Sequence, residues 1–147
     1  MSLRFQVVSH GSPEYAQTVS LRLRILREPL GLTLTPEQLA EETSDLHLSA
    51  FLADTLVGCL VLTPLSSTEV KMRQVAIDTD FQRQGIGKQL VAFSEQVARE
   101  HGYTIMVLHA RETAVPFYLS LAYEIVGEPF TEVTLPHRNM QKSLPAV

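Results

Sequence analysis

Residues Gln82-Arg83-Gln84-Gly85-Ile86-Gly87 decide the fold of this chain. They lie between an apolar run and a long amphipathic run, so they are predicted to connect a strand to a helix. A glycine-rich turn at that place holds backbone N–H groups open for an anion, and the helix that follows adds its positive end. The stretch therefore predicts a site for a phosphorylated ligand, the alternative being a tight connection that binds nothing.

Two nucleotide-binding motifs are excluded by the same residues. A dinucleotide-binding fingerprint needs a third glycine, and that position is Leu90. A Walker phosphate loop ends in Gly-Lys-Ser/Thr, whereas Gly87-Lys88 is followed here by Gln89. Hydride-transfer and phosphoryl-transfer enzymes are disfavoured accordingly.

Composition bounds the remaining classes. The 147 residues have the length of one domain, residues 1–147, and a formal net charge of -4, which argues against a nucleic-acid binder. The single cysteine, Cys59, lies in an apolar run and is predicted to be a buried, inert thiol. No apolar stretch approaches the roughly 18 residues of a membrane span, and no leader is visible, so we expect a cytoplasmic protein without a membrane partner.

Hydrophobic periodicity gives the expected order of elements as a strand, two helices, three strands, a helix, a strand, a helix and two strands. The expected strands cover residues 3–9, 46–53, 56–64, 69–77, 103–108, 123–126 and 133–140. Helices are expected from Pro13 to Gly31, from Thr35, from the glycine turn to Gly102, and over 113–121. The middle strands should be antiparallel, and the strand–helix–strand unit around the glycine turn should be parallel.

The glycine turn and its surroundings resemble the GNAT superfamily of N-acetyltransferases. The acetyl-CoA motif of that family reads Arg/Gln-x-x-Gly-x-Gly/Ala, and Gln82, Gly85 and Gly87 fill it. The segment from Ala114 to Phe117-Tyr118, about thirty residues further on, strengthens the resemblance. Three further segments, 23–31, 126–130 and 135–140, resemble the ElaA-like acetyltransferases, which are small bacterial proteins.

The resemblance implies an α/β fold. It is a mixed, mostly antiparallel sheet of about six or seven strands, flanked by about four helices and splayed between its two central parallel strands. Acetyl-CoA is the implied co-substrate, without a metal. Its pyrophosphate would meet the backbone around Gln82, Arg83, Gln84, Gly85, Gly87 and Lys88, and its pantetheine arm would pair with the strand near Val75 and Ile77. Phe117 and Arg111 are also expected at the cofactor; relatives often carry Asn or Gln in place of Arg111, and arginine can reach a phosphate instead.

The implied reaction is direct attack of a primary amine on the thioester in a ternary complex. Tyr118 matches the usual general acid of the family, and a phenol is protonated at neutral pH, as that role requires. The base is open among His137, Glu128 and Glu112, and Arg27, with Arg24, is a candidate for the acceptor pocket. A small-molecule amine is the expected acceptor. The alternative is a non-catalytic acyl-CoA sensor, and the resemblance favours a homodimer.

Overall fold

Residues 3–146 are described by a computed structural model of the protein. Seven strands pair in the order β1-β2-β3-β4-β5-β7-β6. The β1–β2, β2–β3, β5–β7 and β6–β7 pairs are antiparallel, and the β4–β5 pair is parallel. The predicted fold class, a mixed and mostly antiparallel sheet with four α-helices, is confirmed. The elements divide into two compact units, one made of residues up to 63 with 74–94, the other of 64–73 with the residues from 95 onward.

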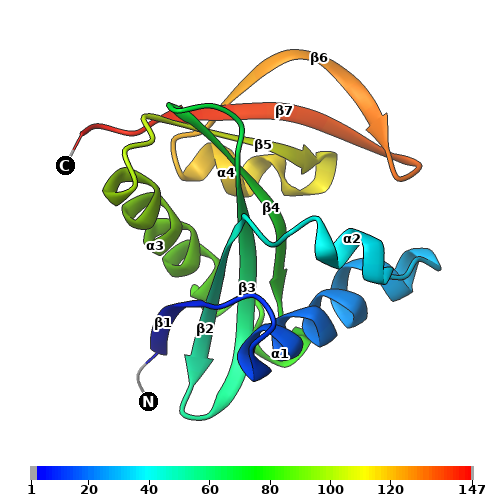
Figure 1. The fold of residues 1–147 in the computed structure, drawn as a ribbon. Helices are drawn as coiled ribbons and strands as arrows, with labels where there is room; N and C mark the ends of the chain where they lie inside the picture. Colours follow the sequence, from blue (N-terminus) through cyan, green and yellow to red (C-terminus); the bar gives the residue numbers. More distant parts are fainter. Residues whose placement is uncertain (1–2, 147) are drawn as a thin grey trace. The chain divides into compact units, whose positions relative to one another are not determined.

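The first unit contains three antiparallel strands and two capped helices (Figure 1). The strands are β1 (Leu3–Val8), β2 (Leu46–Leu52) and β3 (Thr55–Pro64). Ser12 caps α1 (Pro13–Arg22) by accepting a hydrogen bond from the Tyr15 N–H, and Thr35 with Gln38 forms a capping box on α2 (Pro36–Ala40). The β2–β3 turn falls at Ala53-Asp54, one residue earlier than expected, and Ala53 takes the positive φ of 54°.

The first helix differs from the prediction in its second half. After α1 the chain forms a π-helical turn over Leu23–Arg27 and a 3-10 turn over Glu28–Leu30, and it ends at Gly31 with a φ of 70°. The Glu28 N–H donates to the Leu23 carbonyl, five residues back. Such turns occur often at functional sites, and hydrophobic spacing does not distinguish them from an α-helix.

The second unit contains the outer strands. The first part of β4 (Glu69–Ile77) pairs in parallel with β5 (Ile105–Arg111), and β7 (Leu135–Ser143) lies between β5 and β6 (Glu124–Glu132). β6 and β7 form one long hairpin (Figure 1). The short helix α4 (Val115–Ser120), preceded by a 3-10 turn over Glu112–Ala114, matches its prediction.

Three strands in the second unit have other boundaries than predicted. The strand expected over 103–108 begins and ends later, at Ile105 and Arg111. The last two strands are longer than expected, because β6 continues through Pro129 where a break was predicted. Its register shifts between Val126 and Phe130, so a bulge around Gly127, with a φ of 75°, carries the proline inside the strand.

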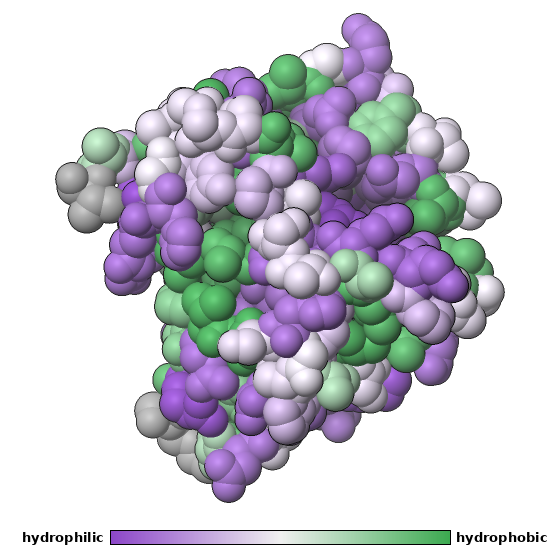
Figure 2. Space-filling view, in the orientation of Figure 1, coloured by the Kyte–Doolittle hydropathy of each residue, from purple (hydrophilic) through white to green (hydrophobic). Residues whose placement is uncertain are grey.

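Helix α3 (Ile86–Glu100) spans the boundary between the units. Its first half buries Ile86 and Leu90, and its second half buries Val97. Among residues 3–146, no helix is both long and apolar enough to cross a membrane. On the face drawn in Figure 2, hydrophobic side chains are interspersed with hydrophilic ones.

Candidate active site

The glycine turn in the first unit leaves backbone donors unused. Arg83 and Gly85 both take left-handed conformations, with φ of 64° and 80°, and the first hydrogen bond into α3 runs from the Gln89 N–H to the Gly85 carbonyl. The N–H groups of Ile86, Gly87 and Lys88 precede that bond, so they have no carbonyl partner within the helix. A Cβ on Gly85 would meet only the Gln89 Nε2, at 4.0 Å. The turn is therefore open, and its donors fit an anionic group.

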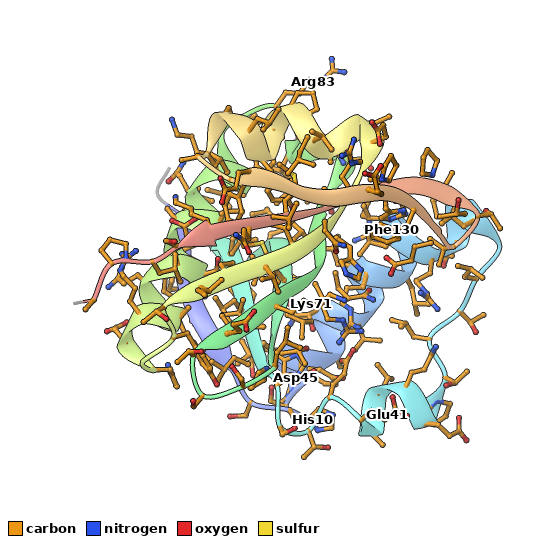
Figure 3. The ribbon with its side chains drawn as sticks, turned by 90° about the horizontal axis from the view of Figure 1, so that it is seen from above. His10, Glu41, Asp45, Lys71, Arg83 and Phe130 are labelled. Atoms are coloured by element: carbon orange, nitrogen blue, oxygen red, sulfur yellow. The ribbon has the colours of Figure 1, made fainter. Side chains whose placement is uncertain are left out.

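Some polar side chains near the turn hydrogen-bond to the backbone that leads into it, and others are exposed. Gln82 Nε2 donates to the Ile77 carbonyl at 3.0 Å, which ties the turn to the end of β4. Asp78 caps the 3-10 turn over Thr79–Phe81 by accepting from the Asp80 N–H at 3.1 Å. Arg83 is exposed and extends away from the ribbon (Figure 3). Gln84 and Lys88 are exposed as well.

The backbone of β4, the strand before the turn, departs from the extended conformation at Gln74, which has a positive φ of 55°. The β4–β5 register ends at Met72 and Leu108, although β4 continues to Ile77 and β5 to Arg111. The resemblance to GNAT proteins implies a splay between these two strands, and their pairing ends at this point. Beyond it, Val75 and Ile77 are half-buried, and Gly58 on β3 provides the space for Ile77, because a Cβ there would lie 2.8 Å from the Ile77 Cδ1.

Tyr118 lies on α4 in the second unit and is 7 % exposed. Its ring meets the rings of Phe117 and Tyr123 edge-on, with centroids 5.0 Å and 5.7 Å away. Burial raises the pKa of the Tyr118 phenol to about 12. The phenol is therefore a proton donor rather than a phenolate over the whole neutral range.

The comparisons with known proteins agree with this geometry. The family described as the acetyltransferase (GNAT) domain matches residues 27–144. The chain belongs to the GNAT family. A Bacillus subtilis protein, YyaT, itself described as uncharacterized, is 32 % identical over 74 residues, which are 50 % of each chain. The match thus spans about half the length of that curated relative.

Two solved structures show the extent of the GNAT fold. Escherichia coli ElaA has a TM-score of 0.80 and 18 % identity, over 96 % of this chain and 99 % of its own. An aminoglycoside 6'-N-acetyltransferase complexed with coenzyme A has a TM-score of 0.82 and 17 % identity, over 98 % of both chains. At these identities the likeness concerns the fold, and it agrees with the resemblance to ElaA-like proteins that the sequence shows.

The remaining predicted site residues of this GNAT chain lie as follows. Arg111 ends β5 and is half-buried, and so is Phe117 on α4. Arg27 closes the π-helical turn and donates from Nε and Nη2 to the Thr33 carbonyl, at 3.0 Å and 2.8 Å. Glu128 is exposed in the bulge of β6. His137 is buried in β7, 4 % exposed, with its Nδ1 2.9 Å from the Leu135 carbonyl.

A polar cluster that the sequence did not indicate lies near His137. His109 on β5 contacts both Glu132 on β6 and Lys71 on β4. Glu132 is 23 positions and Lys71 is 38 positions from His109 in the chain, so the strand pairing brings them together. Cys59, in contrast, is as expected: it is 1 % exposed, and burial raises the pKa of its thiol to about 12.

Proposed function

We propose that the protein is an N-acetyltransferase that transfers the acetyl group of acetyl-CoA to a primary amine of a small molecule. The observation that carries the proposal is the open turn at Gln82–Lys88, whose free N–H groups are those that the GNAT motif uses for the pyrophosphate of coenzyme A. Gln82, Arg83, Gln84, Gly85, Gly87 and Lys88 would hold that group. Val75 and Ile77 would pair with the pantetheine arm, with Arg111 and Phe117 as further contacts.

In the proposed reaction the amine nitrogen attacks the thioester carbonyl directly. A C–N bond forms and the C–S bond breaks, and the departing thiolate takes the proton of the Tyr118 phenol. The proton of the amine goes to a base, for which His137 and Glu128 are the candidates from the sequence. Cys59 takes no part, since its thiol is buried and protonated at neutral pH. We place Arg27 at the acceptor, and we propose that residues 1–147 act as one cytoplasmic domain and as a homodimer.

Calorimetry with acetyl-CoA and a thiol-release assay over a panel of primary amines test the proposal together. We expect saturable binding of acetyl-CoA and release of free coenzyme A with at least one amine class among polyamines, amino sugars and amino acids. Binding without turnover of any amine would favour the alternative, a non-catalytic acyl-CoA sensor. Failure to bind acetyl-CoA would overturn both.

A further inference from the structure

The four strands of the second unit present two different faces. Because side chains alternate along a strand, the residues of β5 and β7 divide between the faces. One face buries Met106, Leu108 and Met140, each 2 % exposed or less. The other face carries the residues between these positions. They are Lys71, His109, Arg111, Phe130, Glu132 and His137, as the pairs Lys71↔Val107, Arg111↔His137 and Phe130↔His137 show.

His109 is the centre of this polar face. Its Nδ1 lies 3.0 Å from Oε1 of Glu132 and 3.3 Å from Nζ of Lys71. The Phe130 ring, on the same hairpin as Glu132, meets the imidazole edge-on with centroids 4.9 Å apart and so fixes its plane. The second carboxylate oxygen of Glu132 lies 3.7 Å from Nε2 of His137. Lys71 lies on β4 and Phe130 on β6 (Figure 3).

The short contact to Glu132 determines which imidazole nitrogen carries the proton. A carboxylate accepts hydrogen bonds and cannot donate them, so a contact of 3.0 Å requires the proton to lie on Nδ1. In a neutral imidazole with its proton on Nδ1, the other nitrogen, Nε2, keeps a free lone pair. A donation from Lys71 to Nδ1 would require the opposite tautomer. The two neighbours therefore compete for one nitrogen, and the 3.0 Å contact favours the carboxylate.

We propose that His109 is the general base of the transfer, a catalytic residue that takes the proton of the acceptor amine on Nε2, and that Glu132 is its positioning residue. The inference rests on the proposed function. As the amine nitrogen bonds to the acetyl carbon, its N–H bond breaks and the proton moves to Nε2. The resulting imidazolium donates from Nδ1 to the Glu132 carboxylate, whose charge stabilises it.

Accessibility distinguishes His109 from the bases that the sequence suggests. The His109 side chain is 31 % exposed, whereas that of His137 is 5 % exposed and has its Nδ1 at the Leu135 carbonyl. Glu128 is exposed in the bulge of β6. Of these three residues, His109 is the one that combines access with a carboxylate that orients it.

The charged groups around His109 come from every strand of this face. Lys71 and Arg73 approach from β4, Arg111 follows on β5, and Glu132 and His137 lie on β6 and β7. Burial alone would raise the pKa of Glu132, but the hydrogen bond from His109 and the charges of His109, His137 and Lys71 lower it. Burial lowers the pKa of Lys71, and the charge of Glu132 acts in the opposite direction.

Two variants with matched controls test the role in the wild-type background. For His109→Gln we expect kcat to fall by about 10²-fold or more, the loss typical of a missing general base, with the Kd of acetyl-CoA unchanged. The acidic limb of the pH–rate profile, which is the fall of kcat toward low pH as the base is protonated, should also disappear in this variant. His101→Gln, which changes a histidine at the end of α3, should leave both unchanged. Full turnover with an intact acidic limb in His109→Gln would overturn the proposal.

Glu132→Gln separates positioning from a structural role. The amide oxygen can still accept from Nδ1, but the charge is lost, so kcat should fall about 10-fold and the acidic limb should move to lower pH. Glu124→Gln on the same strand, whose carboxylate pairs with Gln141, is the control and should move neither. A loss of kcat in Glu132→Gln without a shift of the limb would overturn the positioning role.

A third measurement needs no variant and no turnover. The ¹⁵N spectrum of the neutral His109 imidazole in the wild-type protein should show the proton on Nδ1, and a proton on Nε2 would overturn the proposal. Failure of the proposed function is distinguishable from failure of this inference. If the proposed function is wrong, the wild-type protein releases no thiol with any amine. If only this inference is wrong, the wild-type protein is active and the His109→Gln variant is equally active.

Discussion

The guanidinium of Arg22 and the carboxylate of Glu42 form a buried ion pair that joins the end of α1 to the segment after α2. Nη1 donates to Oε1 at 2.9 Å and Nη2 donates to Oε2, and the side chains are 1 % and 5 % exposed. Tyr15 donates a third hydrogen bond to the same carboxylate at 2.9 Å. The pair stabilises this segment only while both charges are present, because either one alone would be buried without compensation.

Glu42→Gln should destabilise the protein strongly. Removing the carboxylate charge leaves Arg22 buried and unpaired, so we expect the free energy of unfolding to fall by about 3 kcal/mol or more. Urea unfolding followed by circular dichroism measures it. Glu41→Gln changes the adjacent, exposed residue and should cost less than about 0.5 kcal/mol. Equal stability of the two variants would contradict the role of the pair.

His47 should make the stability depend on pH. It is 2 % exposed, its Nε2 lies 2.9 Å from the Glu42 carbonyl, and its Nδ1 has no hydrogen-bond partner within residues 3–146. Burial lowers the pKa of His47 below the value of about 6.5 that is usual for an imidazole, against the opposing effects of the Glu42 carbonyl and carboxylate. Since the unfolded chain takes up the proton first, stability should fall as the pH drops below about 6.5.

The measurement is the free energy of unfolding between pH 7 and pH 5 in the wild type and in His47→Gln. The slope should be smaller in the variant, because the group that binds a proton only after unfolding is gone. His101→Gln removes an exposed histidine and should keep the wild-type slope. The same slope in all three proteins would show that His47 is not the source.

Tyr118→Phe tests the general acid. The phenol is the proton donor of the proposed reaction, so we expect kcat to fall by about 10²-fold while the Kd of acetyl-CoA stays within twofold. Turnover assays and calorimetry measure the two quantities. Tyr103→Phe, at a half-buried tyrosine before β5, is the matched control. Undiminished turnover in Tyr118→Phe would remove this residue as the acid.

Gly85→Ala should weaken acetyl-CoA binding through the backbone. The added methyl group has room, but the φ of +80° strains any residue with a Cβ by about 1–2 kcal/mol. We expect the turn to shift and the Kd of acetyl-CoA to rise at least tenfold. Gly102→Ala is the control, because Gly102 has a similar φ of +88° and an added Cβ would meet nothing within 4 Å. It should lower the stability of the protein as much as Gly85→Ala does, without changing the Kd of acetyl-CoA. An unchanged Kd in Gly85→Ala would show that the turn does not hold the cofactor.

Local patterns predicted the elements whose boundaries depend on local chemistry. The limits of β4 at Glu69 and Ile77 agree with the prediction, and so do the start of α1 at Pro13 and the end of α3 before Gly102. Pro129 misled the prediction, because a proline normally ends a strand, yet the bulge beside Gly127 lets β6 continue. The glycine turn was found because its motif is contiguous.

The polar cluster around His109 could not be predicted, since it depends on the register of four strands. Lys71, His109 and Glu132 have no common sequence pattern, and they meet only through the β4–β5, β5–β7 and β6–β7 pairs. The same holds for Arg22 and Glu42, which are 20 residues apart. The sequence does not show which charged residues pair in the interior, because tertiary structure brings the partners together.

The bulge in β6 has a consequence for the behaviour of the chain at high concentration. β6 is the last strand in the order of the sheet, and it carries the exposed apolar side chains Ile125 and Val126. A flat edge of this kind invites another chain to add a strand. Pro129 lacks an N–H donor, and the shifted register at Gly127 breaks the regular spacing of the free groups. The middle of β6 therefore acts as a gatekeeper against aggregation by strand addition.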